Sequence, residues 1–383
     1  SNYSFGEGGA GAYSDGKLYT RSKKRGNVDR ILRVFCQHGA HTDILCDAHP
    51  HIGTDRLPRI IEAMREQIRK SGGEVYFQSR VDALLMQRET VCGVRLENGR
   101  EYQGPVILAT GHSARDVYRY LKESGIQIEA KGIAVGVRLE HPAYIIDCIQ
   151  YHNSRGRGRY LPAAEYSYVA QSGGRGVYSF CMCPGGQVVA AASEEGGVVV
   201  NGMSMFKRDS GIANSALVVN VSPDDFGNDP LAGVEFQRKY ERLAFAYGGK
   251  NYYAPAQNVA SFLAQTEPLL KTMVNASYRP GITACDLNKV LPRYVTDTLR
   301  LGIQSFGRKL TGYDDGGALL TGVETRTSAP VRIERERQSY VSVSHDLLYP
   351  CGEGAGYAGG IMSAALDGWH VARAIMSRFA PIK

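Results

Sequence analysis

Several features that would identify a common enzyme or membrane-protein class are missing from this chain of 383 residues. No apolar run approaches the roughly 20 residues that a helix needs to cross a bilayer, so we expect no membrane span. The eight cysteines form no Cys-x-x-Cys pair and have no zinc-type spacing to histidine, so no metal site is predicted. Neither paired carboxylates nor a Ser-His-Asp set stands out as a catalytic centre.

A complete dinucleotide-binding motif is also missing, although the pattern G-x-G-x-x-G occurs twice. Such a motif needs a strand before the glycines and a helix after them. The pattern that begins at Gly6 has too few residues before it for a strand. The pattern that begins at Gly354 lies between a predicted strand and a predicted helix, but no room follows for the strand that carries a ribose-binding acid. We expect both patterns to make secondary contacts to a nucleotide whose main binding motif stands upstream of Ser1.

Glycine is the residue in excess: the 45 glycines crowd into 6–16, 172–176, 185–202 and 352–360. Glycine allows tight turns and lets the backbone approach a ligand closely. The loop at 6–16 presents backbone N–H groups that can hold a phosphate or the polar edge of a flavin ring. After the second pattern, a helix N-terminus carries about half a positive charge, which suits an anion.

Hydrophobic periodicity divides the chain into three segments. Residues 1–125 alternate helix and strand, residues 126–330 predict short antiparallel strands with two helices, and residues 331–383 return to strand, glycine turn and helix. We therefore predict an α/β protein (α+β overall) with a discontinuous, truncated, Rossmann-like FAD-binding domain. A mostly antiparallel substrate or lid domain interrupts it.

Local signals place the individual elements. Thr54 or Asp55 caps a helix that the Gly72-Gly73 pair ends, and Asn98-Gly99 is a hairpin turn. The continuous apolar run at 105–109 predicts a strand buried in a parallel sheet. The other predicted strands are 74–77, 81–86, 91–96, 100–103, 133–139, 176–181, 188–192, 217–221 and 347–351, and the further helices are 231–247, 289–306 and 361–377.

Ordered stretches that span nearly the whole chain resemble the NAD(FAD)-utilising dehydrogenases, a family of uncharacterised FAD-dependent proteins. They are FGEGGAGAYSDGKLYT (5–20), DAHPHIGT (47–54), ATGHSARD (109–116), GVRLEHP (136–142), YSFCMCPGG (178–186), NGMS (201–204) and CGEGAGYAGGI (351–361). The family is similar in fold to the flavoprotein group that includes glutathione reductase. The resemblance implies a two-domain protein that binds FAD non-covalently, of which this chain is the C-terminal part.

The resemblance also implies roles for residues. Asp15 or Lys17 would hydrogen-bond the flavin ring, Val81 would contact the adenine through its backbone, and Glu353 would lie near the ribitol or the phosphates. The full set of implied cofactor residues is Gly6, Glu7, Gly8, Gly9, Ala10, Gly11, Ser14, Asp15, Gly16, Lys17, Val81, Ala109, Thr110, Gly111, Gly352, Glu353, Gly354, Gly356, Tyr357, Ala358, Gly359, Gly360 and Ile361.

Catalytic residues are less defined. Lys17, Asp15, Cys351 and His112 are weak candidates, and His49, His51 and His141 are alternative proton donors or structural histidines. Cys181 and Cys183 form either a redox pair or two buried small residues, and Cys351 is the stronger redox candidate because it adjoins the glycine turn. The run 324–328 either holds an anion or is a loop with an internal ion pair.

We expect an FAD-dependent oxidoreductase that transfers hydride through flavin N5, with NAD(P)H as a potential electron donor and an unidentified substrate. One alternative is a flavin- or nucleotide-binding protein without turnover. A second is a tRNA-modifying flavoprotein, suggested by the basic runs at 21–25 and 155–159. No nucleic-acid-binding module is present, so we expect no nucleic-acid partner. Dispersed cysteines without a disulfide pattern indicate a cytoplasmic protein.

Overall fold

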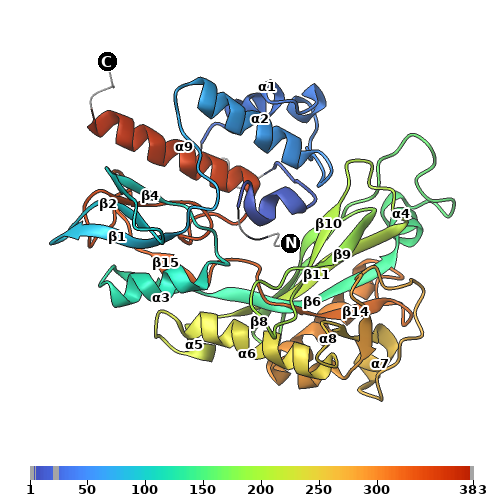
Figure 1. Cartoon of the computed structure of the whole chain (residues 1–383). Helices are drawn as coiled ribbons and strands as arrows, with labels where there is room; N and C mark the ends of the chain where they lie inside the picture. The colour runs from blue at the N-terminus through green and yellow to red at the C-terminus, as the bar shows by residue number, and fades with distance from the viewer. Residues whose placement is uncertain (1–3, 5, 20–25, 380–383) are drawn as a thin grey trace.

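The computed structural model describes residues 4, 6–19 and 26–379, and it confirms a mixed α/β protein with a large, mostly antiparallel sheet (Figure 1). The sheet has seven strands in the order β13-β12-β14-β6-β11-β8-β7. Neighbouring strands run antiparallel except β12 and β13. The strands are β6 (Ile133–Pro142), β7 (Val169–Ser172), β8 (Arg175–Cys183), β11 (Ile212–Val221), β12 (Ala254–Asn258), β13 (Ile282–Ala284) and β14 (Leu319–Glu324).

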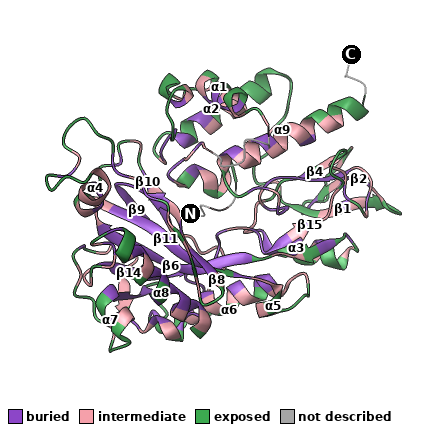
Figure 2. Cartoon of the chain, turned by 180° about the vertical axis from the view of Figure 1, so that it is seen from behind, coloured by how far each residue is buried: buried purple, intermediate pink, exposed green. Residues whose placement is uncertain are grey.

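The central strand β6 has two different faces. Val137 and Leu139 belong to the main apolar core, which also contains Leu299 of the helix α8 (Arg293–Lys309). Successive side chains of a strand point to opposite faces, so Arg138 and Glu140 are directed away from this core. Both are nevertheless fully buried, and Figure 2 shows β6 and β11 buried along most of their length. The sheet therefore holds charged side chains inside the molecule.

Further elements accompany this sheet. Strand β10 makes contacts with β6, β8, β11 and β14, and it pairs with β9 in a two-stranded sheet. These elements are β9 (Gly186–Ala190), β10 (Val200–Ser204), α4 (Ala143–Tyr151), α5 (Pro223–Phe226), α6 (Ala232–Tyr247), α7 (Val259–Ala264) and the 3-10 helix η4 (Leu287–Lys289).

The two ends of the chain build a second region (Figure 1). Helices α1 (Val28–Gln37), α2 (Leu57–Lys70) and α9 (Ile361–Arg378) share an apolar core. Beside them lie three small sheets: β1-β2-β3, the parallel pair β4-β16 and the antiparallel pair β5-β15. These strands are β1 (Val81–Gln87), β2 (Thr90–Leu96), β3 (Glu101–Gln103), β4 (Val106–Leu108), β5 (Ile128–Ala130), β15 (Val331–Ile333) and β16 (Leu348–Pro350), with helix α3 (Arg115–Glu123) and 3-10 helices η1 (Gly9–Tyr13) and η3 (Thr42–Leu45).

Most predicted elements are present, with two corrections. The run 74–77 is not a strand; Tyr76 and Phe77 are 44% and 52% exposed, so no neighbouring strand or core covers them. Arg56, without a side-chain cap, precedes α2 instead of Thr54 or Asp55. Asp55 instead accepts a hydrogen bond from the backbone N–H of Phe206. In the region that the structure describes, no helix has both the length and the apolar character required to span a bilayer.

Candidate functional site

The two glycine-rich loops come together at the start of α9. Gly354 packs so closely against Gly111 that a Cβ atom at position 354 would lie 2.5 Å from the Gly111 carbonyl oxygen. On the other side, a side chain at Gly11 would lie 3.4 Å from Cγ1 of Ile361. Three stretches that are far apart in the sequence thus meet at one place, as the sequence predicts for cofactor contacts.

Open space lies in front of these turns. A Cβ atom added to Gly111, Gly352, Gly359 or Gly360 would have no heavy atom within 4 Å. Helix α9 has Gly360 as its N-cap, no side-chain cap and no acidic residue in its first turn. Its unpaired backbone N–H groups and partial positive charge therefore face a space in which an anionic or electron-rich group can sit.

His112 and Glu353 form a partly buried pair beside these turns. Their closest atoms, Nε2 of His112 and Oε1 of Glu353, are 3.5 Å apart. Burial lowers the pKa of His112 to about 4, and the charge of Arg326 acts in the same direction. Burial raises the pKa of Glu353 to about 7, against the opposing charge of Lys131. Near neutral pH, Glu353 can therefore hold or release a proton next to the glycine turn.

Lys17 connects the first glycine loop to the large sheet. Its Nζ donates a hydrogen bond to the backbone carbonyl of Met182 in β8. Burial alone would lower the pKa of Lys17, but the nearby carboxylate of Asp15 contributes most to raising it overall. Lys17 is therefore a partly buried cation between the loop and the sheet.

Strand β8 contains a bulge where Lys17 meets it. Phe180 pairs with Ala216 of β11 and Cys183 pairs with Asn214, so two residues of β8 oppose one residue of β11. Cys181 has a φ of 44°, a left-handed conformation that costs a non-glycine residue on the order of 1–3 kcal/mol. Cys181 and Cys183 are both inside this bulge or at its edge, and Cys183 donates a hydrogen bond to the carbonyl of Cys181 at 3.3 Å.

Arg138 is the buried cation on the other side of the bulge. Its Nη1 donates to the Cys181 carbonyl at 2.8 Å and lies 3.9 Å from Sγ of Cys183. Its guanidinium also makes two hydrogen bonds to Glu324 and one to Asn201. Burial raises the pKa of Glu324 to about 7, although Arg138 opposes the shift.

The Arg138 cluster (Arg138, Cys181, Cys183, Asn201, Asn214 and Glu324) explains several of the sequence stretches quoted above. Position 202, next to Asn201, is a glycine because a Cβ atom there would lie 2.4 Å from Nη1 of Arg138. The run 324–328 has no internal ion pair. Glu324 binds Arg138, whereas Arg326 binds Glu241, so residues 325–328 form a loop as one interpretation held, but its internal ion pair is wrong.

Asp15 has a different environment from the one expected. It is 1% exposed, and both of its oxygens accept hydrogen bonds from Arg208. Arg208 also donates to Glu165 at 2.6 Å. Asp15 therefore anchors the loop 6–19 to the large sheet, and its role at a flavin ring stays a prediction.

The remaining predicted cofactor residues have varied positions. Ser14 accepts a hydrogen bond from the N–H of Gly16, and Glu7 pairs with Arg65 of α2 at 2.6 Å. The hydroxyl of Tyr357 donates to the carbonyl of Ile333. Val81 begins β1, in the separate three-stranded sheet, and is 49% exposed. The loop residues Gly6, Gly8, Gly9, Gly16 and the turn residues Gly352 and Gly356 all have positive φ.

Cys351 is an apolar-core thiol. It is buried with Tyr349 and Val371, and burial raises its pKa to about 12. A thiol with this pKa stays protonated and unreactive at neutral pH. The environment of Cys351 therefore reverses the order of redox candidates expected from the sequence.

The other histidines make structural contacts. His49 stacks on Tyr19, His51 stacks on Phe206, and His141 binds the carbonyl of Tyr313 at 2.8 Å. Burial lowers the pKa of His141 to about 4. Of the four histidines, His112 is the one paired with the Gly352–Gly360 turn.

A second buried ionic cluster, which was not predicted from the sequence, centres on Glu241. Arg115 and Arg326 each make two hydrogen bonds to its carboxylate, at 2.7–3.1 Å. Burial alone would raise the pKa of Glu241, but the two guanidinium groups lower it to about 2. The missed signal was the spacing of Gln237 and Glu241 with Val234 and Ala244, which puts polar residues on the buried face of α6.

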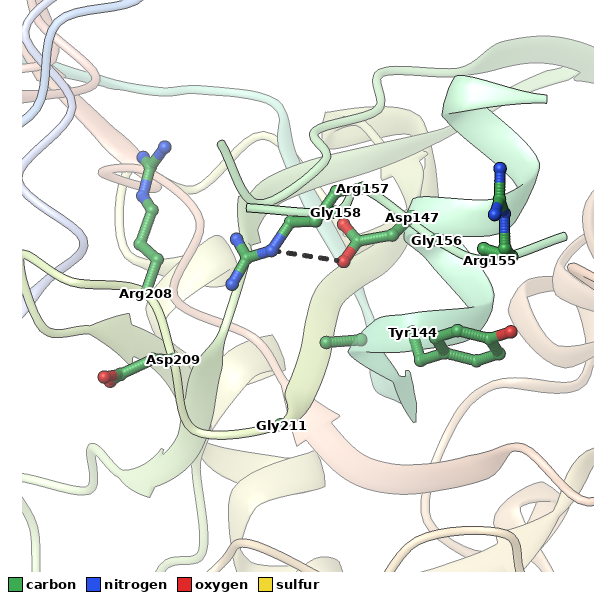
Figure 3. A pocket seen from close by; sticks show the side chains of 10 residues that line it. Tyr144, Asp147, Arg155, Gly156, Arg157, Gly158, Arg208, Asp209 and Gly211 are labelled. Carbon is green, nitrogen blue, oxygen red and sulfur yellow. Dashed lines mark ion pairs between the residues drawn. The ribbon is translucent and has the colours of Figure 1, made fainter. Parts of the chain in front are cut away.

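A pocket of about 310 Å³ lies beyond Arg208, lined by α4 and the basic segment 155–158. Figure 3 shows Arg157 directed toward Asp147, with Nε and Oδ2 3.5 Å apart. Arg208 directs its guanidinium to Asp15 and Glu165. Two arginines of the pocket thus have carboxylate partners. These partners reduce the net positive charge of the pocket and so its attraction for an anionic ligand. The basic run 21–25 lies outside the described residues.

Fold and site together define a protein with a mixed α/β scaffold in which two glycine-rich loops meet at the N-terminus of α9. Its residues 132–327 match the model of the family described as FAD-dependent protein, C-terminal domain-like. An uncharacterized protein of Clostridium beijerinckii is 47% identical over 382 residues, which are 99% of this chain and 71% of that protein. The chain belongs to this family of FAD-dependent proteins.

Solved structures show more distant likenesses. An oxidoreductase from Methanosarcina mazei is 12% identical, with a TM-score of 0.32, and the match covers 83% of this chain and 54% of that one. Glycine oxidase from Bacillus cereus is 10% identical, with a TM-score of 0.30 and coverage of 96% and 75%. The chain spans about half the length of the first of these structures. Within the described residues, no group of three His, Cys, Asp or Glu side chains is placed to hold a metal ion.

Proposed function

We propose that this protein is an FAD-dependent oxidoreductase and that the chain binds the flavin and ribityl part of FAD at the start of α9. The observation that carries the proposal is the meeting of both glycine-rich loops at an uncapped helix N-terminus with open space before Gly111, Gly352, Gly359 and Gly360. Membership of an FAD-dependent family supports it. When bound, FAD supplies hydride transfer at N5.

The residues present suit such a ligand. Glycines allow the backbone to approach a flat ring, and Gly352 has the positive φ of 76° that favours glycine. The N-terminus of α9 stabilises negative charge on a nearby group. Lys17 adds a partly buried cation on the side of the first loop. The cradle is therefore built to hold an electron-rich ring that gains negative charge on reduction.

The pair of His112 and Glu353 gives the site a means of moving a proton. Glu353 titrates near neutral pH, and its Oε1 faces Nε2 of a histidine that is neutral there. Protons can thus enter or leave at Oε1 of Glu353 without a permanent charge next to the turn. We expect this pair to set the pH dependence of turnover around pH 7.

Titration of the protein with FAD tests the cofactor proposal. The substitution Gly359→Asp puts a carboxylate at the N-terminus of α9 without a clash, because no atom lies within 4 Å of the added Cβ. We expect about tenfold weaker FAD binding, since the new charge repels the electron-rich ring. Flavin fluorescence measures the FAD affinity of the unmodified protein and of the variant.

Gly368→Asp is the matched control. Gly368 is also in α9 and also has open space around its Cβ position, but it lies two turns further along, where the helix dipole is no longer felt. Equal FAD affinity of the two variants and the unmodified chain would refute the proposed cradle.

Reduction by NAD(P)H separates the enzyme from the alternative of a flavin-binding protein without turnover. Under anaerobic conditions, we expect NADH or NADPH to bleach the flavin absorbance and air to restore it. A bound flavin that neither reductant bleaches would favour the alternative, in which the cradle only stores or senses the cofactor.

A further inference from the structure

We propose that Cys181 and Cys183 form a dithiol–disulfide couple that passes an electron pair from the bound flavin to a small disulfide substrate. The inference rests on the proposed function, because the flavin is the source of the electrons. It adds a substrate class and two catalytic residues to that function.

The bulge in β8 brings the two thiols together. In a regular strand, residues two apart are separated by about 6.6 Å along the strand axis, close to the upper limit for a disulfide. The left-handed backbone of Cys181 shortens this path. The thiol of Cys183 is directed back toward Cys181 and donates a hydrogen bond to its carbonyl at 3.3 Å.

Two cations flank the pair, of which Arg138 is fully buried and Lys17 partly buried. Lys17 binds the carbonyl of Met182, between the two cysteines. Arg138 binds the carbonyl of Cys181 and touches the sulfur of Cys183. The hydrogen bond from Cys183 lowers the pKa of Cys181 to about 5, and Arg138 and Lys17 lower it further against the effect of burial. Reactive cysteines are found in such electropositive surroundings.

The two thiols have different access. Cys181 is partly exposed, whereas Cys183 is buried, and the hydrogen bond to Cys181 raises the pKa of Cys183. Cys181 is therefore the attacking thiolate, and Cys183 is the resolving thiol. An attacking residue recessed between the first loop and the sheet favours a small disulfide over a bulky one.

The couple also lies close to the proposed flavin site. Lys17 of the first glycine-rich loop donates a hydrogen bond to the carbonyl of Met182, between the two cysteines. That loop forms one side of the proposed cradle. The bulge thus lies against a loop that would hold the cofactor.

The reaction balances as two exchanges. The thiolate of Cys181 attacks the substrate disulfide and releases one substrate thiolate; Cys183 then attacks Cys181 and releases the second, to which its own proton passes. The products are two substrate thiols, after uptake of one further proton, and the Cys181–Cys183 disulfide. Two electrons and one proton from the reduced flavin return the pair to thiol and thiolate.

Not all cysteines share these surroundings. Burial raises the pKa of Cys285 to about 11 and of Cys351 to about 12. Both are in apolar clusters. They serve as internal references for thiols that stay reduced and slow to react.

Redox titration with reduced and oxidised dithiothreitol, before any flavin is added, tests the couple directly. After free thiols are alkylated and the protein is digested, we expect mass spectrometry to find the peptide with residues 181 and 183 unalkylated and two hydrogens lighter. Cys181→Ser and Cys183→Ser should each abolish this species, and Cys285→Ser should leave it unchanged. Absence of the disulfide in the unmodified protein would overturn the inference and leave the proposed flavin function intact.

Electron transfer is tested with the FAD-loaded protein. When the disulfide form is mixed anaerobically with a reductant that reduces its flavin, we expect two thiols to appear at 181 and 183 for each flavin reoxidised. Thiol release from glutathione disulfide then tests the substrate class. A flavin that stays reduced while the disulfide persists would overturn the inference. If no FAD binds, the proposed function falls and the electron-transfer step falls with it, while the disulfide seen without flavin is a separate result.

Discussion

The buried ionic cluster around Glu241 and the Arg138 cluster differ in the ratio of basic to acidic groups. Around Glu241, one carboxylate is held by two guanidinium groups, those of Arg115 and Arg326, and its pKa falls to about 2. In the Arg138 cluster, one guanidinium serves the carboxylate of Glu324 and the nearby thiol of Cys181. There burial dominates, and the pKa of Glu324 rises to about 7.

This difference separates a structural cluster from a reactive one. Burial penalises every charge, and a single partner does not always offset that cost. Where cations are in excess, the carboxylate stays ionised at every physiological pH. Where acidic groups are in excess, as around Arg138, protons are shared near neutral pH. Groups that titrate in this range mark functional sites more often than structural ones.

The largest expected effect comes from Glu241→Gln. The substitution leaves Arg326 buried without a counter-ion and Arg115 with Glu194 as its remaining partner, and breaking such a cluster costs on the order of 3–5 kcal/mol. Urea unfolding at neutral pH measures the loss. Glu129→Gln is the matched control, since Glu129 pairs with Arg332 at the surface, 51% exposed, where a pair contributes less than about 1 kcal/mol. Equal costs for the two substitutions would contradict the structural role of Glu241.

Glu324→Gln should reveal the opposite dependence on pH. The folded-state pKa of Glu324 lies above its ordinary value of 4.5, so ionisation disfavours the folded state. The stability of the unmodified protein relative to the variant should fall by on the order of 3 kcal/mol as the pH rises from about 4.5 to about 7. The same comparison for Glu241→Gln should be flat in this range, because its low pKa acts only below about pH 4.5. If the stability of the unmodified protein relative to Glu324→Gln rose with pH in this range, the inferred difference between the two clusters would be wrong.

Lys17→Met tests how the cations near the Arg138 cluster affect the thiol of Cys181. It removes one of the cations that lower the pKa of Cys181, so we expect this pKa to rise by about one unit and alkylation below the midpoint to slow about tenfold. The rate of iodoacetamide labelling at residue 181, followed against pH, measures it. Lys289→Met is the control, because Lys289 acts on Cys285 and not on the bulge. An unchanged labelling profile in Lys17→Met would exclude Lys17 from the site.

Local patterns in the sequence predicted much of the fold. Short runs separated by polar and glycine turns predicted β6, β8 and β11, and the Asn98-Gly99 turn joins β2 to β3 as expected. The failure at 74–77 has a physical reason: β-branched and aromatic residues favour a strand only where a partner covers them. The extent of each domain, with limits at 125 and 330, stays a prediction.

The site was less predictable, because its residues are adjacent only in three dimensions. The stretches that contain Lys17, Arg138, Cys181 and Asn201 were recognised one by one, but nothing in a single sequence shows that they converge. Long-range pairs such as Asp15 with Arg208 are also invisible in local patterns. The ranking of Cys351 above Cys181 failed for the same reason: reactivity depends on neighbouring charges, and only the fold supplies them.

The smallest expected effect is that of Cys351→Ala, which tests whether nearness to the glycine turn is enough to make a thiol reactive. Cys351 adjoins Gly352, but it lies beside Asp367, which is paired with Arg335, so no excess of positive charge acts on it. We expect a loss of stability of about 1 kcal/mol, from one small buried side chain, with no change in FAD affinity or in the Cys181–Cys183 disulfide. Urea unfolding measures the stability, flavin fluorescence the FAD affinity, and the peptide map described above the disulfide. Loss of the disulfide in this variant would mean that position relative to the turn, and not the balance of charge around Arg138, decides which thiol reacts.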